Sequence, residues 1–294
     1  MMKRAIWLSD IHLDHLPPPE SALFLESIKK LSGTAIWISG DIGQADTIVE
    51  FLAQMESTLE LPIYFVLGNH DYYLSSINNV RSRVQKAFDN SRRLCWLSDS
   101  DVKEISPDVG LLGHDSWADG RLGEYEASDL LLNDYILIRD FNPFLQRSET
   151  VGPSSPLGPN DLMDLICGKQ TKQNRLLIMQ ALADEAVEYI ERRLPAALQK
   201  YKHVYFLTHV PPFKEACWHQ GRISDDNSLP HFSAKVVGET LVRIMEKHPD
   251  RQLTVLCGHT HSGGVAQVLS NLVVYTAQAV YGNPDIQKIF SFED

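Results

Sequence analysis

The amino-acid sequence predicts an α/β protein whose sheets are covered by helices. Short apolar runs rich in β-branched and aromatic residues alternate with stretches of helical period. The apolar runs are continuous, which is typical of strands buried on both faces and joined by helical crossovers. The chain has 294 residues, of which 44% are hydrophobic and 22% are charged, so it can bury a large core. We expect one catalytic domain over 1–294, with an insert, because α/β domains commonly exceed 200 residues.

The expected elements of the first half follow in chain order. Strands are predicted at 4–9, 35–39 and 63–67. Helices are predicted at 20–31, 47–59 and near 76–90, because apolar residues recur there with helical spacing. Three closely spaced runs follow, as antiparallel strands would, at 94–98, 102–105 and 109–113.

The second half begins with a long helical period. This helix is expected from about 174 to 193, where Pro195 ends it. Two apolar strands are predicted after it, at 204–208 and 253–257. The final apolar runs are expected to form a β meander, at 265–269, 272–276 and 288–292.

Composition restricts the functional classes. The formal net charge is −11, and no basic cluster is longer than a pair, which argues against nucleic acid as a bulk partner. The four cysteines lie far apart, so neither a disulfide framework nor a zinc ribbon is indicated. The apolar N-terminal run is too short for a signal peptide, and no 18-residue apolar stretch follows. We expect a cytoplasmic protein without membrane contact.

Polar residues gather where predicted strands end. Asp, Asn or His follows five strands, in the segments SDIHLDH, GDIGQ, GNHDYY, THVPPF and GHTHSGG. The carboxyl ends of strands in open α/β sheets form the binding crevice. Each motif alone has an ordinary structural explanation, such as a turn, a helix cap or a core histidine. Together they predict a metal site, since oxygen and imidazole ligands without thiolates favour Mn, Fe or Zn.

The order D-x-H, G-D, G-N-H-D, H and G-H-x-H over residues 10 to 261 resembles the calcineurin-like metallophosphoesterase superfamily. The GNHD block, in place of an arginine-containing RGNHE block, favours a branch other than the Ser/Thr protein phosphatases. The resemblance implies a four-layer α-β-β-α sandwich of two mixed sheets. It also implies hydrolysis of phosphomonoesters or phosphodiesters.

The resemblance further implies two metal ions and their ligands. Asp10, His12 and His261 would hold one ion. Asn69, His209 and His259 would hold the other. Asp41 would bridge the two, which lie roughly 3.5–4 Å apart in such centres. A hydroxide shared by the metals is the expected nucleophile.

His70 remains without a metal role in this scheme. It is the expected general acid toward the leaving group, or a source of positive charge in the transition state. Asp71 is a second catalytic candidate, because a carboxylate can orient an imidazole. Equally, Asp71 could cap the helix that follows.

The interval 115–175 carries no metal motif and is predicted to form a cap that selects the substrate. A structural or dimerisation insert is the alternative. Its segment 148–161 is rich in Pro, Gly and Ser, which is typical of a loop. Candidate contacts to the substrate are His114, His231, Arg121, Arg139 and Arg147, with Trp117, Tyr125 and Tyr135 as stacking surfaces.

The sequence therefore predicts a dinuclear metal-dependent phosphoesterase that acts on a small molecule. One alternative is a metallophosphoesterase-like scaffold that binds partners without catalysis, although every expected ligand is present. A nuclease or a cyclic-nucleotide phosphodiesterase is another alternative. The natural substrate and the oligomeric state stay open.

Overall fold

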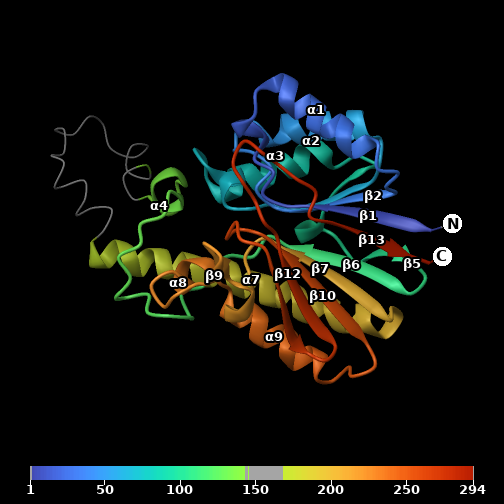
Figure 1. The fold of residues 1–294 in the computed structure, drawn as a ribbon. Helices are drawn as coiled ribbons and strands as arrows, with labels where there is room; N and C mark the ends of the chain where they lie inside the picture. Colours follow the sequence, from blue (N-terminus) through green and yellow to red (C-terminus); the bar gives the residue numbers. More distant parts are fainter. Residues whose placement is uncertain (1, 143–144, 146–167, 294) are drawn as a thin grey trace.

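The computed structural model describes residues 2–142, 145 and 168–293. Two sheets pack face to face, and helices cover the outer face of each sheet (Figure 1). The predicted four-layer α/β sandwich is therefore confirmed. Among the described helices, none combines the length and apolar character needed to cross a bilayer.

The first sheet has five strands in the order β13-β1-β2-β3-β4. Their bounds are Lys288–Phe292 (β13), Lys3–Leu8 (β1), Ala35–Ser39 (β2), Ile63–Val66 (β3) and Leu94–Trp96 (β4). β1 to β4 are parallel, and β13 pairs antiparallel with β1. Its helices are α1 (Pro18–Lys29), α2 (Ile48–Leu59) and α3 (Ile77–Phe88).

The second sheet has six strands in the order β11-β12-β10-β7-β6-β5. Their bounds are Gly264–Leu269 (β11), Leu272–Thr276 (β12), Gln252–Cys257 (β10), His203–Thr208 (β7), Val109–His114 (β6) and Lys103–Ser106 (β5). The four inner strands are parallel, and each edge strand is antiparallel to its neighbour. The helices α7 (Lys169–Lys200) and α9 (Lys235–Met245) cover this sheet.

Shorter helices and strands lie in the loops between these elements. The short helices and strands are α4 (Asp134–Leu137), α8 (Leu229–Phe232), β8 (Trp218–His219) and β9 (Arg222–Ile223). The 3₁₀ helices are η1 (Leu13–His15), η2 (His70–Tyr72), η3 (Leu97–Asp99) and η4 (Lys214–Ala216).

The period of two along each strand explains how continuous apolar runs fill two separate cores. On β1, Ile6 and Leu8 pack in the large core that also contains residues of the covering helices, whereas Trp7 packs between the sheets. Trp37 of β2 likewise meets Tyr205 of β7, with ring centroids 5.0 Å apart. The unbroken hydrophobicity of these strands reflects burial on both faces.

Two predicted strand groupings are wrong. The runs at 94–98 and 102–105 are not antiparallel neighbours, because β4 pairs parallel with β3 while β5 pairs with β6 in the other sheet. The C-terminal runs are not one meander, because β13 crosses to β1 after β11 and β12 have paired in the second sheet. Local pattern identifies a strand, but its partner depends on contacts that are distant in sequence.

Pro195 does not end the long helix, which continues to Lys200. Proline inside a helix removes one backbone hydrogen bond and costs about 3 kcal/mol. Leu194 directly before the proline, and Ala197 and Leu198 after it, are buried. Their packing keeps the segment helical beyond the proline.

Candidate metal centre

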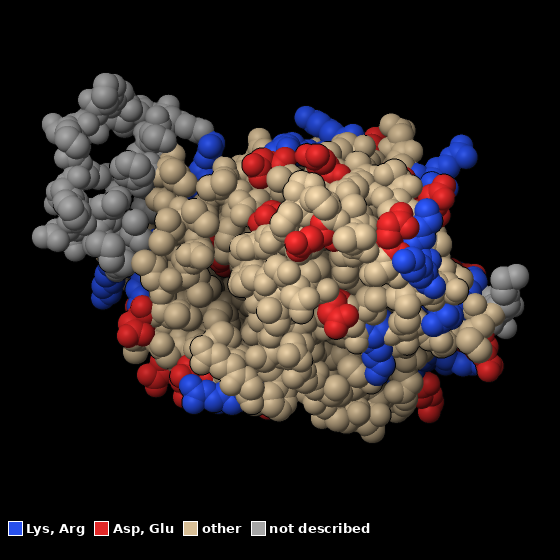
Figure 2. All heavy atoms as spheres, turned by 45° about the horizontal axis from the view of Figure 1, so that its top comes forward, with Lys and Arg blue, Asp and Glu red and all other residues tan. Residues whose placement is uncertain are grey.

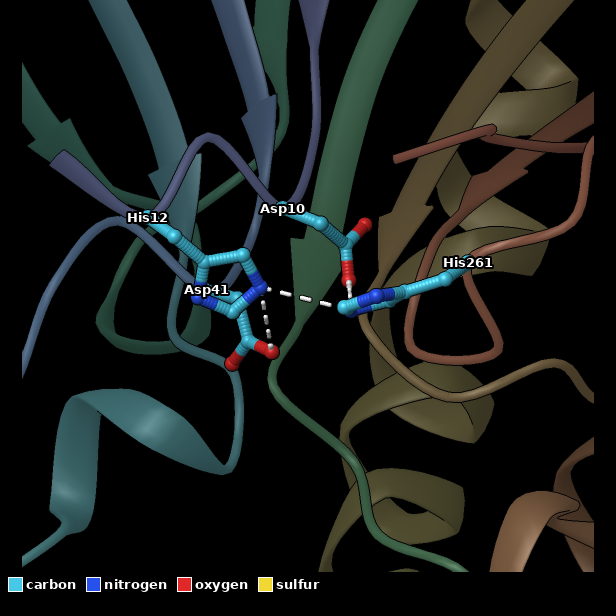
Figure 3. Close-up of side chains that lie close together, drawn as sticks. All are labelled: Asp10, His12, Asp41 and His261. Carbon is cyan, nitrogen blue, oxygen red and sulfur yellow. Dashed lines mark hydrogen bonds and ion pairs between the residues drawn. The ribbon is translucent and has the colours of Figure 1, made fainter. Parts of the chain in front are cut away.

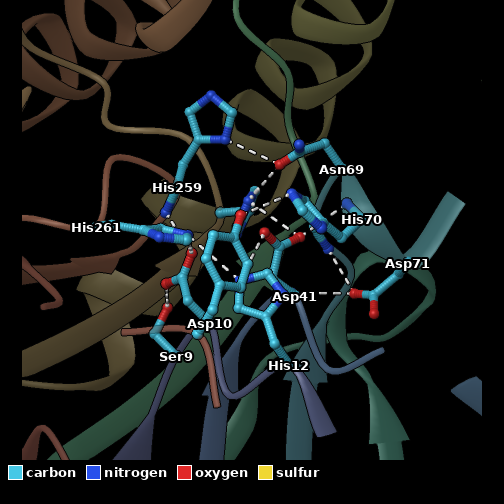
Figure 4. A network of polar contacts seen from close by, with 12 residues as sticks. Ser9, Asp10, His12, Asp41, Asn69, His70, Asp71, His259 and His261 are labelled. Carbon is cyan, nitrogen blue, oxygen red and sulfur yellow. Dashed lines mark hydrogen bonds and ion pairs between the residues drawn. The ribbon is translucent and has the colours of Figure 1, made fainter. Parts of the chain in front are cut away.

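The carboxyl ends of five strands, β1, β2, β3, β7 and β10, converge at one edge of the sandwich. The loop that follows each strand delivers polar side chains into the same place (Figure 4). The structure brings together all seven residues that the sequence predicted as ligands: Asp10, His12, Asp41, Asn69, His209, His259 and His261. They form two adjoining clusters.

The first cluster consists of Asp10, His12, Asp41 and His261, whose ligand atoms all lie within 4.8 Å of one another (Figure 3). His12 Nε2 lies 3.3 Å from His261 Nε2 and 3.7 Å from Asp41 Oδ2. His261 Nε2 lies 3.5 Å from Asp10 Oδ1. Two carboxylates and two imidazoles thus face one point.

The second cluster is centred on Asn69. Its Oδ1 lies 2.8 Å from His209 Nε2 and 2.9 Å from His259 Nδ1. His209 Nε2 is also 3.4 Å from Asp41 Oδ1. The two oxygens of Asp41 therefore face different clusters, one toward His12 and the other toward His209.

Backbone carbonyls fix which nitrogen of the second-cluster histidines carries the proton. His209 Nδ1 donates to Ser39 O at 2.9 Å, and His259 Nε2 donates to His231 O at 3.2 Å. A carbonyl can only accept, so the other ring nitrogen of each neutral imidazole carries a lone pair. Metal-bound histidines usually donate their second nitrogen in this way.

The donor atoms of the second cluster fit a cation. When both imidazoles are neutral, their lone pairs point at the Asn69 oxygen, which is also only an acceptor, so the three atoms are held together only by a positive charge between them. Burial lowers the pKa of His209, but the Asp41 carboxylate outweighs burial and raises it to about 10. A positive charge is thus favoured at this point. Without a metal the proton on His209 supplies it, and a bound metal ion would replace that proton.

The first cluster also fits a cation. Burial lowers the pKa of His12 to about 3, so its imidazole is neutral, which is the form that binds metals. Although burial acts in the opposite direction, His209 and neighbouring imidazoles hold the pKa of Asp41 well below its usual range. The Asp41 carboxylate is therefore ionised.

The backbone of the site is strained. Ten non-glycine residues of the described chain have positive φ, and five of these are predicted ligands: Asp10, His12, Asp41, His259 and His261. Such conformations cost free energy and concentrate at functional sites. Close backbone approach adds a second constraint, because a Cβ at Gly258 would overlap the Asp10 carboxylate.

His70 lies at the mouth of the centre. Its backbone N–H donates to Asp41 Oδ1 at 2.9 Å, and its ring stacks on Tyr73 with centroids 4.2 Å apart. Its Nε2 lies 3.4 Å from the hydroxyl of Tyr281, while its Nδ1 is buried without a hydrogen-bond partner in the described structure. His70 lines the same cavity as Asn69, His259 and His261, so a substrate bound there would meet it.

Asp71 does not contact the His70 imidazole through any hydrogen bond of the described residues. Its carboxylate accepts from the backbone N–H groups of Asp41, Ile42, Gly43 and Gly68, at 2.8–3.1 Å. These bonds support neither alternative considered for Asp71, orienting the imidazole or capping the next helix. Asp71 ties the loop after β2 to the loop after β3.

The two histidines suggested as substrate contacts are both buried. His114 lies within 3.9 Å of Glu185 and packs beside Tyr189, away from the two clusters. The His231 ring is held between the hydroxyls of Ser128 and Tyr135. Neither side chain is available to a substrate, although the backbone carbonyl of His231 orients His259.

The arginines suggested as phosphate contacts lie elsewhere. Arg121 pairs with Asp119 and Asp184, and neither it nor Arg139 lines the cavity at the metal centre. Arg147 and the segment 148–161 fall outside the described residues.

The aromatic candidates are part of the large hydrophobic core. Trp117, Tyr125 and Tyr135 are each at most 5% exposed. Trp117 packs on Tyr72 and Phe141. Their burial excludes stacking on a substrate in this structure, so the part of 115–142 that carries them is an integral layer of the fold.

A cavity of about 260 Å³ opens onto the centre. Its lining includes Tyr73, Asp134 and Tyr281, which were not among the predicted site residues. Tyr281 comes from the loop between β12 and β13, and its ring centroid lies 4.6 Å from that of His12 and 4.8 Å from that of His261. Asp134 accepts from Asn69 Nδ2 at 2.8 Å. Of the three, only Tyr73 had a sequence signal, because it closes the GNHDYY segment.

A family model described as Calcineurin-like phosphoesterase matches residues 3–263. The chain belongs to the calcineurin-like phosphoesterase family. The match covers all five strand-end motifs, but it does not separate the GNHD type from other branches of the family. No curated protein sequence matches the chain.

Solved structures resemble this calcineurin-like phosphoesterase across nearly its whole length. A phosphopantetheinyl hydrolase from Mycobacterium tuberculosis has a TM-score of 0.58 at 12% identity, covering 95% of this chain and 90% of the other. A dimetal phosphatase from Danio rerio has a TM-score of 0.54 at 13% identity, covering 96% and 89%. A Thermus thermophilus protein has a TM-score of 0.51 at 13% identity, covering 99% of both. At these identities the likeness shows the fold.

Proposed function

We propose that this protein is a dinuclear metal-dependent hydrolase of phosphomonoesters or phosphodiesters. The observation that carries the proposal is the position of Asp41, whose two oxygens face His12 and His209 in separate clusters at 3.7 and 3.4 Å. A bridging carboxylate is what a pair of metal ions requires. Membership of the calcineurin-like phosphoesterase family supports the same reaction class.

Asp10, His12 and His261 would hold one ion, and Asn69, His209 and His259 the other, with Asp41 shared. When bound, the two ions would supply Lewis-acid stabilisation of the phosphate and activation of water, a task suited to Mn, Fe or Zn.

The protein's own contribution beyond the ligands centres on His70. Its ring lies edge-on to His12, with centroids 4.6 Å apart, and is held from the other side by Tyr73. This position suits donation of a proton to the leaving oxygen, or stabilisation of negative charge that develops there. Tyr281 lines the same cavity, and its hydroxyl lies 3.4 Å from His70 Nε2.

Surface charge supports a small substrate over a nucleic acid. On the face drawn in Figure 2, Lys and Arg lie mainly around the edge, while the centre carries uncharged residues and scattered Asp and Glu. The net charge of −11 points the same way, because nucleic-acid binding relies on clustered basic side chains. A nuclease is therefore the weaker candidate.

We also propose that the interval 115–175 acts as a cap within a single domain. Leu132, Asn133 and Asp134 of this interval line the cavity at the metal centre, which supports a role in substrate selection. If a compact ester binds in this 260 Å³ cavity, the three residues would lie beside its leaving group.

Replacement of Asp41 by Asn tests the metal centre. Asp41→Asn leaves one acceptor oxygen where two are required, so both metal sites should weaken and turnover should fall below detection. Elemental analysis of the purified protein, with rates on p-nitrophenyl phosphate and bis-p-nitrophenyl phosphate, measures both effects.

Two variants control this experiment. Asp46→Asn makes the same chemical change at an exposed position of the same loop and should behave as wild type. His261→Ala should remove chiefly one ion. Two tightly held metals and a normal rate in Asp41→Asn would rule out the bridging role. A wild-type protein that holds two metals but hydrolyses neither ester would favour the scaffold alternative.

A further inference from the structure

The segment between β6 and α7 sends one carboxylate into the metal centre. Asp134, at the start of α4, is buried, and its Oδ1 accepts from Asn69 Nδ2 at 2.8 Å and from the Tyr73 hydroxyl at 2.7 Å. We propose that Asp134 is a positioning residue that aims the Asn69 oxygen at one metal and holds Tyr73 against His70. The inference rests on the dinuclear centre of the proposed function and deepens it.

The first part of the inference follows from the symmetry of an amide. Asn69 can rotate its side chain by half a turn and exchange its oxygen with its nitrogen at little steric cost. In the exchanged position its NH₂ group would donate to the lone pairs of His209 and His259. That arrangement would satisfy the imidazoles without a metal and would leave no oxygen ligand.

Asp134 opposes this exchange. The Asp134 oxygen that faces Asn69 also accepts from the Tyr73 hydroxyl, so it acts as an acceptor and requires the NH₂ group of Asn69 on its own side. The amide oxygen is then committed to the side where His209 Nε2 and His259 Nδ1 lie. The hydrogen bond from its NH₂ group to Asp134 also polarises the amide and makes its oxygen a better metal ligand.

The second part concerns the catalytic histidine. The Tyr73 hydroxyl donates to the same oxygen of Asp134, and the Tyr73 ring stacks on His70 at an interplanar angle of 30°. One buried carboxylate therefore fixes a metal ligand and the ring that supports His70. Both links come from the described stretch 115–142, which contains none of the predicted metal ligands.

Metal binding by Asp134→Ala tests the inference without relying on activity. Metal-free protein is titrated with Mn²⁺, and the bound metal is counted after equilibrium dialysis. The site that contains Asn69 should weaken roughly 10–100-fold, the usual effect of losing a partner of a metal ligand, while the other site keeps its affinity. Asp129→Ala, an exposed carboxylate of the same segment, should leave both sites unchanged.

The double variant Asp134→Ala with His261→Ala identifies the affected site. Because His261 belongs to the first cluster, the remaining ion should then be the weakened one. Unchanged affinity in Asp134→Ala, or an equal loss at both sites, overturns the inference. If Asp134→Ala does not fold, Asp134→Asn decides by the same criterion, with about a threefold or greater selective loss expected because a charge-assisted hydrogen bond becomes a neutral one.

The two proposals fail in different ways. A wild-type protein that binds two Mn²⁺ ions but hydrolyses no ester overturns the proposed reaction and leaves the role of Asp134 intact. Equal Mn²⁺ binding by wild type and Asp134→Ala overturns the positioning role alone. A wild-type protein that binds fewer than two Mn²⁺ ions overturns both.

Discussion

His70 is the residue whose surroundings say most about the chemistry of the centre. It is neither a predicted ligand nor a core side chain, yet three contacts hold it in place. Its backbone is bound to Asp41, its ring face rests on Tyr73, and its Nε2 meets Tyr281. A side chain fixed in this way beside the proposed metal pair is suited to act on the leaving group.

Substitution of His70 should separate proton donation from charge stabilisation. His70→Ala is expected to keep both metals and to lose roughly 10²–10⁴ in kcat, the usual contribution of a general acid. The loss should be smaller for p-nitrophenyl phosphate than for an alkyl phosphate, because nitrophenolate needs little protonation. Steady-state rates on both esters measure this difference.

His248→Ala, a histidine substitution near the end of α9, serves as the matched control and should change neither rate. An equal loss on good and poor leaving groups would assign His70 to charge stabilisation.

At the scale of elements, the segment between β6 and α7 combines two tasks. Trp117, Tyr125 and Tyr135 build a buried layer, and Leu132 to Asp134 line the cavity at the metal centre. Replacing the whole segment by a linker would therefore remove core and cavity wall together. Single substitutions on the wall are the sharper test of the proposed cap.

Leu132→Ala should alter substrate preference while sparing the metals. Loss of apolar contact worth roughly 1–2 kcal/mol should change the kcat/KM ratio between a bulky ester and a small ester by about 5–30-fold. Competition between paired phosphate esters measures the ratio directly.

Leu131→Ala is the matched control, since Leu131 packs against the core and does not line the cavity. The same ratio in wild type and Leu132→Ala would argue against this wall as the selector. The loop at 211–233, which contributes His219 to the cavity, would then be the next candidate.

For the whole molecule, partly or fully buried histidines with lowered pKa values connect stability to pH. His203, at the start of β7, lies 2.8 Å through Nε2 from Thr254 Oγ1 and stacks on Tyr205. Burial lowers the pKa of His203 from 6.5 to about 4. Between these values the unfolded chain binds the proton and the folded chain does not, so stability falls as pH decreases through this range.

His203→Gln should reduce this dependence, because Gln keeps a polar partner for Thr254 and does not titrate. The free energy of unfolding should decrease less in the variant than in wild type between pH 7 and pH 5. Urea unfolding of both metal-free proteins measures the two slopes. Parallel slopes would show that His203 does not contribute to the acid sensitivity of the fold.

Much of the site could be predicted because its signals are local. A continuous apolar strand followed directly by Asp, Asn or His places that side chain at the carboxyl end of a strand, whatever sheet the strand joins. This holds for Asp10, Asp41 and His209, and it explains why the seven predicted ligands converge although two predicted strand groupings were wrong. The four-layer fold itself entered through the family resemblance.

Only the tertiary structure decided the surroundings of the centre. Asp134 meets Asn69 across 65 positions of sequence, and Tyr281 meets His70 across 211. Arg121 was a reasonable phosphate contact by residue type, but Asp119 and Asp184 already pair with it. Local sequence determines which side chains leave a strand end, whereas long-range packing determines which of them are neutralised, buried or left facing the cavity.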